Sequence, residues 1–240
     1  MSNIKTQIDS IQFRLKHSLL SYDKLLFFLQ YIYSKNIKVH SMFRNEFKRE
    51  VTFFLSNFEA KLKIMHLYSS KTLIIEFYGL YQYSKCGTPI DSLQIVLNLL
   101  EELFNHYPKL TLPISRVDIC YDSTTPILTT KKRTLLKWQR NTYQLDKITY
   151  HPTSITWGTK KTRFKIVAYD KTVKNNLDVQ IYRLEISIKE AYKKLVPING
   201  LLDLISYCSL LQSEFEETLL IEDNKPLFHP INSYETLKYA

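Results

Sequence analysis

The sequence predicts an α+β fold in which a central antiparallel sheet is flanked by helices. Segments that alternate apolar and polar side chains outnumber the helical segments, and short turns join those late in the chain. A doubly wound parallel sheet would need a more regular alternation of strands and helices. The chain has 240 residues, is 45% hydrophobic and contains no Gly/Ser-rich or Pro-rich linker, so we expect one compact domain over residues 1–240.

Hydrophobic periodicity predicts the elements in chain order. Strands are expected at residues 10–17, 60–68, 71–80, 114–123, 154–160, 163–171 and 181–189. Helices are expected at residues 21–34, with Ser21 as the cap, and at 89–108, 129–140 and 198–220. The segment 47–58 fits a helix and a strand equally. Residues 199–240 are expected to hold a C-terminal helix and an irregular tail, the tail from 222 onward.

The charge of the chain favours polyanionic partners, nucleic acid first and an acidic membrane surface second. Lys and Arg number 33 against 23 Asp and Glu, a net charge of +10. A biased base composition of the gene explains the same excess. No stretch approaches about 18 consecutive apolar residues, and the first residues lack an export signal, so neither membrane spanning nor export is expected.

Several function classes lack their motifs. Cys86, Cys120 and Cys208 are odd in number and widely separated, so we expect neither a disulfide framework nor a zinc site, and a reducing cytoplasm fits best. The sequence contains no G-x-G-x-x-G, P-loop, H-E-x-x-H or G-x-S-x-G pattern. Nucleotide cradles of those kinds, a histidine-based metal site and acyl transfer are therefore not indicated.

Carboxylates and an arginine share one face of the strand at 114–123. Residues two apart on a strand point to the same side, so Arg116, Asp118 and Asp122 do so here. Two such carboxylates repel each other unless a cation lies near them, and oxygen ligands of this kind suit Mg²⁺ or Mn²⁺. An Arg-Asp pair at a strand edge explains the same residues without a metal.

Two further carboxylates have strand context. Arg183 and Glu185 share a face of the strand at 181–189, and Glu76 lies inside the apolar run "LIIEFY". A buried Glu76 has to be paired or bound to a metal, whereas an exposed one needs no explanation. If the strands at 114–123 and 181–189 are neighbours, their polar rows combine into an acidic centre with arginines around it.

Tyr169 stands near the end of the strand at 163–171, in the sequence Tyr-Asp-Lys. A tyrosine hydroxyl is a poor nucleophile at neutral pH because its ordinary pKa is near 10. It becomes effective when a divalent cation polarises the attacked phosphate and a lysine stabilises the developing charge. Lys171 is expected on the same strand face, where it could be that lysine. The chain has 17 tyrosines, so a structural role for Tyr169 is the alternative.

The order of these motifs resembles that of the replication initiators of rolling-circle plasmids of the staphylococcal, trans-acting type, and more distantly that of filamentous-phage initiators. The family pattern is Arg-x-Asp-x-x-x-Asp, then an aromatic-Gly segment and a strand ending Tyr-x-Lys, then Arg-x-Glu. The matching residues here are Arg116, Asp118 and Asp122, then Trp157 and Gly158, Tyr169 and Lys171, then Arg183 and Glu185, with Glu76 in an upstream element. The match covers residues 72–190, the motif-bearing core.

The resemblance implies a nuclease fold related to the HUH endonucleases, with acidic residues in place of the histidine pair. Tyr169, assisted by Lys171, would nick one strand at an origin and stay joined to the 5′ phosphate, leaving a 3′ hydroxyl. A divalent ion, Mg²⁺ or Mn²⁺, would be held by Asp118, Asp122, Glu185 and Glu76. The residues expected to contact DNA are Arg116, Arg183, Lys160, Lys161 and Arg163, with the basic segment 129–140, and Trp138 and Trp157 as aromatic residues that could stack on unpaired bases.

The expected partners are single-stranded or origin DNA, a second copy of the chain and a host helicase, in the cytoplasm and without a membrane. Two alternatives stay open. The chain could be a non-catalytic DNA-binding regulator or assembly factor on the same fold, or, from charge and aromatic content alone, an RNA-binding protein.

Overall fold

The computed structural model describes residues 6–33, 37–55, 60–124, 148–151, 154–158, 164–189 and 196–220. The strands of the large sheet are β1 (Gln7–Lys16), β2 (Ile37–Arg44), β3 (Lys48–Leu55), β4 (Lys61–Leu67), β5 (Thr72–Tyr78), β8 (Leu112–Ser123), β9 (Ile148–His151), β10 (Ser154–Trp157), β11 (Phe164–Asp170), β12 (Tyr182–Lys189) and β13 (Val196–Ile198). A separate hairpin pairs β6 (Tyr81–Tyr83) with β7 (Pro89–Asp91). The helices are α1 (Tyr22–Phe27), continued by a π-helical turn (Phe28–Ile32), α2 (Leu93–His106), α4 (Lys171–Asn175) and α5 (Leu201–Leu220).

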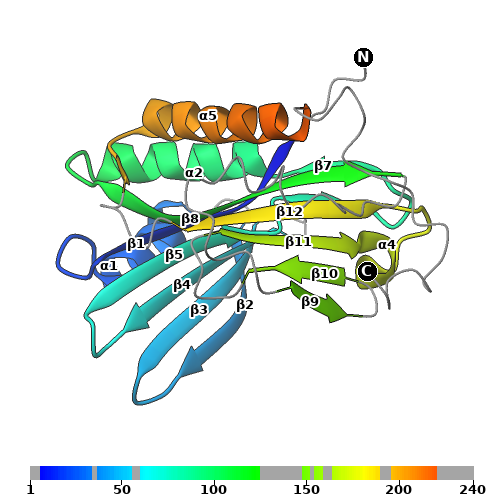
Figure 1. Ribbon diagram of the computed structural model, residues 1–240. Coiled ribbons are helices and arrows are strands. Elements are labelled where there is room, and N and C mark those ends of the chain that lie inside the picture. Colours follow the sequence, from blue (N-terminus) through cyan, green and yellow to red (C-terminus); the bar gives the residue numbers. More distant parts are fainter. Residues whose placement is uncertain are drawn as a thin grey trace.

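The large sheet is antiparallel throughout the described residues. Its strands lie in the order β2-β3-β4-β5-β1-β8-β12-β11-β10-β9, and β13 pairs with β8. The two long helices α2 and α5 lie along one face of this sheet (Figure 1). The predicted α+β fold with a central antiparallel sheet and flanking helices is therefore confirmed.

Each predicted strand and helix within the described residues has an observed counterpart, but Pro89–Asp91, expected to begin a helix, forms β7, and Lys171, expected to end a strand, begins α4. The strands β2, β6, β9 and β13 have no predicted counterpart. The Ser21 hydroxyl caps α1 by accepting a hydrogen bond from the Lys24 amide at 3.2 Å. The ambiguous segment 47–58 contains the strand β3, which pairs with β2 and β4. Its residues Val51, Phe53 and Leu55, two apart, are buried in the core. The predicted helix at 129–140 and the predicted tail lie outside the described residues.

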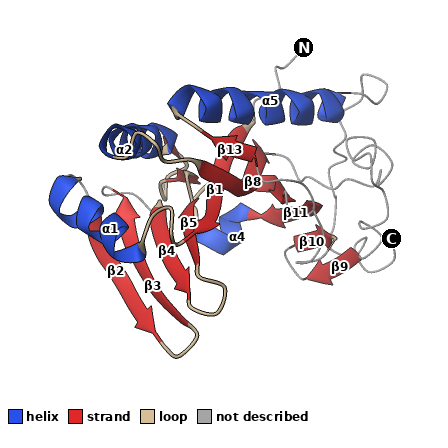
Figure 2. Ribbon diagram, turned by 90° about the vertical axis from the view of Figure 1, so that its left-hand side faces the viewer, coloured by secondary structure: helices blue, strands red, loops and turns tan. Residues whose placement is uncertain are grey.

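Figure 2 shows α2 and α5 beside the large sheet. The hydrophobic core contains residues of these helices and of the sheet. Phe13, Ile119 and Ile186, from three neighbouring strands, are at most 1% exposed. They share this core with Leu100 of α2 and Phe215 of α5. Because side chains alternate across a strand, the polar residues of the same strands collect on the opposite face.

The strands that carry the sequence motifs are neighbours. β12 lies between β8 and β11, so Arg183 is in register with Asp122 on one side and with Tyr169 on the other. Glu185 lies opposite Cys120, one pleat further along. Asp122 and Tyr169, on strands far apart in the sequence, thus lie on either side of Arg183 on the polar face of the sheet, away from α2 and α5.

Truncating the core should destabilise the fold strongly. Phe13 is fully buried and packs edge-to-face on Phe77, with ring centroids 6.4 Å apart. We expect Phe13→Ala to lower the free energy of unfolding by about 3–5 kcal/mol in urea titrations. Phe47→Ala, at a side chain 65% exposed, should change it by less than about 1 kcal/mol. Similar losses for both variants would contradict this core assignment.

Candidate active site

Arg183 is the most deeply buried charge on the polar face. Its side chain is 0% exposed. Its Nε and Nη2 donate to the two carboxylate oxygens of Asp122, each at 2.7 Å, and its Nη1 donates to Asp9 Oδ1 at 2.9 Å. This fork geometry is among the strongest charge-assisted arrangements in proteins. One cation therefore balances two carboxylates in a site shielded from water.

The same network holds the β6 hairpin against the sheet. The Tyr81 carbonyl accepts hydrogen bonds from Arg183 Nη2 at 2.9 Å and from Lys171 Nζ at 3.1 Å. Asp9 Oδ1 accepts from the Tyr81 amide at 3.4 Å and from Gln82 Nε2 at 3.2 Å. The backbone amide and carbonyl of Tyr81 are therefore hydrogen-bonded to charged side chains of the site.

A second ion-pair cluster surrounds Glu76. Arg116 Nη2 donates to Glu76 Oε1, and Lys63 Nζ lies 3.5 Å from Glu76 Oε2. Arg116 Nε lies 3.3 Å from Asp118 Oδ1, and its Nη2 also contacts the Ser10 hydroxyl at 3.3 Å. Glu76 thus has two cationic neighbours, whereas Asp118 shares a single arginine with it.

Tyr169 and Glu185 face each other between these clusters. The Tyr169 hydroxyl donates to Glu185 Oε2 at 3.3 Å. Asp118 lies diagonally opposite Glu185, because it pairs in register with Ser187, which shares the face of Glu185. The tyrosine and the two carboxylates thus occupy adjoining positions on three neighbouring strands.

The two carboxylates resist ionisation in this environment. Burial, together with the charges of Asp9 and Asp118, raises the pKa of Glu185 from its ordinary value of 4.5 to about 7. Burial also raises the pKa of Asp118, although the Arg116 guanidinium opposes this. Excess negative charge is therefore costly at Asp118 and Glu185, and a bound cation would relieve that cost.

Burial and the neighbouring Glu185 carboxylate raise the pKa of Tyr169 well above its ordinary value of 10. The hydroxyl is therefore protonated at neutral pH, as its hydrogen bond to Glu185 requires. The Lys174 ammonium lies over the Tyr169 ring, 4.4 Å from its centroid.

The structure places Lys171 differently from the expectation. β11 ends at Asp170, whose carboxylate accepts a hydrogen bond from the Val173 amide and so caps α4, which begins at Lys171. The Lys171 side chain is 1% exposed, and its ammonium bonds to the Tyr81 carbonyl instead of lying beside the Tyr169 hydroxyl. Burial lowers the Lys171 pKa to about 8. The lysine over the Tyr169 ring is Lys174, one helical turn later.

The residues expected to bind a metal divide into two pairs. Asp122 has both oxygens bonded to Arg183, and Glu76 is bonded to Arg116 and Lys63, so these cations compete with any metal there. Asp118 Oδ1 is buried and accepts no hydrogen bond, and its cationic neighbour, Arg116 Nε at 3.3 Å, is shared with Glu76, so a bound cation would satisfy this oxygen. Asp118 and Glu185 therefore fit a divalent ion, which proteins often hold through one or two carboxylates plus substrate phosphate. The described residues contain no cluster of three or more metal-binding side chains.

Of the residues expected to contact DNA, the structure describes Arg183 and Arg116. Arg183 is fully buried and forms ion pairs with Asp9 and Asp122. It is therefore not available to contact DNA from the surface. Arg116 is 25% exposed and engaged with Glu76 and Asp118. Lys160, Lys161, Arg163 and Trp138 lie outside the described residues, as does the side chain of Trp157.

Sequence reasoning missed two site residues, Asp9 and Lys174. Asp9 lies in a run that should alternate, and strict alternation would put it in the core with Ile11 and Phe13. A register shift between Ile8 and Ser10 turns it toward Arg183 instead, an effect typical of β-bulges. Lys174 follows a detectable helix cap, Asp170, and could have been placed from it.

A cleft of about 450 Å³ opens beside Tyr169. Its lining residues are Asp9, Phe54, Lys61, Tyr78, Gly79, Gln82, Tyr169, Lys174 and Asn175. The candidate nucleophile therefore borders a cavity between the motif strands and the strands β3 to β5.

Fold and site together define an α+β protein in which a tyrosine borders a cleft and hydrogen-bonds to one of two partly uncompensated carboxylates on the polar face of the sheet. The chain is similar to a solved rolling circle replication initiator protein from Geobacillus stearothermophilus, with 14% identity, 98% of this chain and 96% of that chain covered, and a TM-score of 0.48. No protein-family model and no curated protein matches the chain. None of the helices in the described ranges is long and apolar enough to cross a membrane.

Removing the buried guanidinium should destabilise the protein. Arg183→Met leaves Asp9 and Asp122 without their counter-ion, and we expect the free energy of unfolding in urea at pH 7 to fall by about 3–5 kcal/mol. Asp23→Asn removes the carboxylate of the Arg49–Asp23 pair, whose Asp23 side chain is 69% exposed, and should cost only about 0.2–1 kcal/mol. Equal effects would argue against a structural role for the Arg183 network.

Glu185→Gln should stabilise the protein at alkaline pH. The raised pKa means that folding disfavours the carboxylate, so the stability of the wild type falls as pH rises from about 4.5 to about 7. Glutamine stays neutral at every pH. The free energy of unfolding of the variant should therefore exceed that of the wild type by about 1–3 kcal/mol at pH 8 and differ little from it at pH 4.5. Thermal and urea unfolding at both pH values measure this. Glu101→Gln, at an exposed position of α2, is the control. A gain for Glu185→Gln that does not depend on pH would contradict the assignment.

Proposed function

We propose that the chain is a DNA nicking and joining enzyme of the rolling-circle replication initiator kind, with Tyr169 as nucleophile. The observation that carries the proposal is the hydrogen bond from the Tyr169 hydroxyl to Glu185 at 3.3 Å, at the border of the cleft. A nucleophile next to a base that can take its proton is the geometry that covalent catalysis requires. The net charge of +10 supports a polyanionic substrate.

The chemistry conserves the energy of the phosphodiester bond. The Tyr169 oxygen attacks phosphorus and forms a tyrosyl ester to the 5′ phosphate, while the bond from phosphorus to the 3′ oxygen breaks. The tyrosine proton passes to Glu185, and the departing 3′ oxygen takes a proton from solvent to become a hydroxyl. Attack of a 3′ hydroxyl on the tyrosyl ester reverses these steps, so joining needs no nucleotide cofactor.

Three side chains support this step. Glu185 accepts the hydrogen bond of the nucleophile and is the group to which the tyrosine proton passes. The ammonium of Lys174 lies over the phenol ring and stabilises negative charge on the tyrosine as its proton leaves. Asp118 and Glu185 would hold Mg²⁺ or Mn²⁺, whose chemistry is to polarise the phosphate as a Lewis acid.

A covalent-adduct assay tests the proposal. Wild-type protein incubated with a labelled single-stranded oligonucleotide and Mn²⁺ should give a covalent species that migrates with the protein in a denaturing gel. Tyr169→Phe should form none above background, because it lacks the attacking oxygen. Tyr31→Phe is the control, since Tyr31 is an exposed tyrosine of the π-helical turn that does not line the cleft, and it should retain the adduct.

Two outcomes contradict the proposal. An adduct of undiminished yield with Tyr169→Phe would remove the assignment of the nucleophile. Salt-sensitive DNA binding by the wild type without any adduct, over a range of oligonucleotide sequences and with either metal, would favour the alternative of a non-catalytic DNA-binding regulator or assembly factor.

A further inference from the structure

Aromatic rings with a lysine over each recur on the polar face of the part formed by β2, β3, β4 and β5, which we call the wing (Figure 1). The pairs are Lys48 over Phe43 at 5.1 Å, Lys61 over Phe54 at 5.2 Å and Lys63 over Tyr78 at 5.1 Å, each measured from Nζ to the ring centroid. Lys174 over Tyr169, outside the wing, repeats the arrangement. The nucleophile assigned above is therefore one member of a larger set of aromatic-cation pairs.

One row of the wing leads directly into the cleft. Phe54, Lys61 and Tyr78 are consecutive register partners across β3, β4 and β5, so their side chains share one face. All three line the same cleft as Tyr169 and Lys174. The strands β3, β4 and β5 thus form part of the lining of the cleft that Tyr169 also borders.

The lysines that lie over aromatic rings differ in whether a carboxylate pairs with them. Lys48 and Lys63 form ion pairs with Glu50 and Glu76. Within the described ranges, Lys61 and Lys174 have no carboxylate at ion-pair distance, and Lys174 is exposed. The carboxylate that does line the cleft, Asp9, is balanced by Arg183. The cleft therefore contains two ammonium groups that no carboxylate of the described residues neutralises, and of these Lys61 takes no part in the proposed reaction.

We propose that the row Phe54, Lys61 and Tyr78 binds the single-stranded DNA next to the scissile phosphate. The inference rests on the proposed function and adds a subsite to it. Bases of a single strand expose their faces, so they can stack on Phe54 and Tyr78, and the flexible stem of Lys61 lets its ammonium reach the adjoining phosphate. A duplex cannot do this, because its base faces are covered by neighbouring bases. The cleft volume of about 450 Å³ lies within the range of small-ligand sites.

Binding measurements without catalysis test this subsite. Fluorescence anisotropy of a labelled oligonucleotide, in EDTA, gives the affinity as a function of salt. Phe54→Leu keeps an apolar side chain but removes the ring, and should weaken single-strand binding about 5- to 150-fold with an unchanged salt slope. Lys61→Gln should reduce the slope of log affinity against log salt by about 0.7, as expected for one lost phosphate contact.

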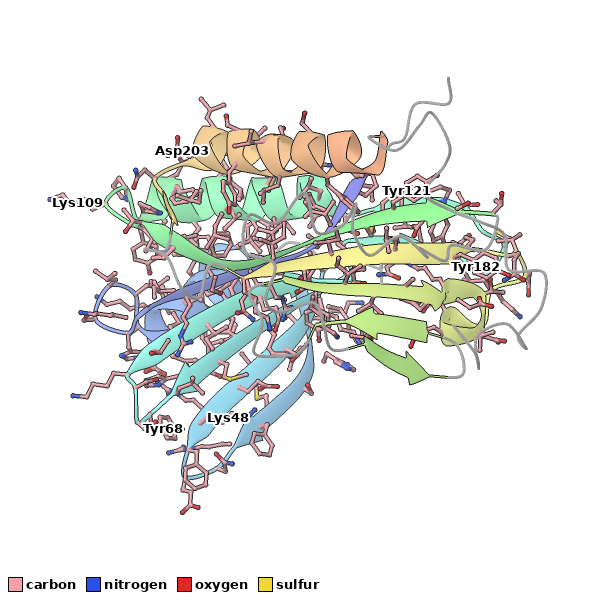
Figure 3. All side chains as sticks on the ribbon, in the orientation of Figure 1. Lys48, Tyr68, Lys109, Tyr121, Tyr182 and Asp203 are labelled. Atoms are coloured by element: carbon pink, nitrogen blue, oxygen red, sulfur yellow. The ribbon has the colours of Figure 1, made fainter. Side chains whose placement is uncertain are left out.

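The chain offers a matched control for each variant. Phe43→Leu removes an aromatic ring of the same wing that also lies under a lysine but does not line the cleft. Lys109→Gln removes the same charge from the turn after α2, away from the wing (Figure 3). Both controls should bind single strands like the wild type, and circular dichroism should show that all four variants are folded.

The outcomes separate this inference from the proposed function. Wild-type affinity and salt slope in both Phe54→Leu and Lys61→Gln would overturn the subsite, even if the wild type forms the covalent adduct. Equal effects of the variants on duplex and single strands would overturn it as well. Loss of single-strand binding in the cleft variants, in a protein that forms no adduct, would support the subsite and refute the nicking activity.

Discussion

The burial of Arg183 is the constraint on which the polar face depends. A guanidinium cannot be neutralised in a protein, so its removal from water requires anionic partners on several sides. Asp122 comes from β8 and Asp9 from the bulge of β1, while the Tyr81 carbonyl comes from the β6 hairpin. One side chain thereby fixes the relative positions of three strands and a hairpin, and the register beside it sets the place of Tyr169.

The distribution of counter-ions then decides which carboxylates are available. Arg183 balances Asp9 and Asp122, and Glu76 has Arg116 and Lys63. Asp118 and Glu185 have less compensation, which is why their pKa values rise. A chain with a large net positive charge thus contains a local acidic centre next to its candidate nucleophile, and the lysines around the cleft oppose the repulsion that this centre would exert on DNA.

Strand periodicity carried most of what the sequence could predict. It placed Arg116, Asp118 and Asp122 on one face, because a regular strand has a period of two. It could not predict which charge pairs with which, since those contacts join strands far apart in the sequence. The bulge at Asp9 breaks the period, and the cap at Asp170 ends β11 before Lys171, so both residues lie where simple alternation does not put them. No sequence motif indicates the proposed single-strand binding by the wing, because its aromatic residues also fit the pattern of a structural strand.

Peptide mapping by mass spectrometry tests most directly whether Tyr169 becomes covalently joined to DNA. After reaction of the wild type with an oligonucleotide and Mn²⁺, nuclease and trypsin digestion should leave a nucleotide on the peptide 166–171, in which Tyr169 is the single tyrosine. A nucleotide found on any other tyrosine peptide, with peptide 166–171 unmodified, would contradict the assignment of Tyr169 as the nucleophile.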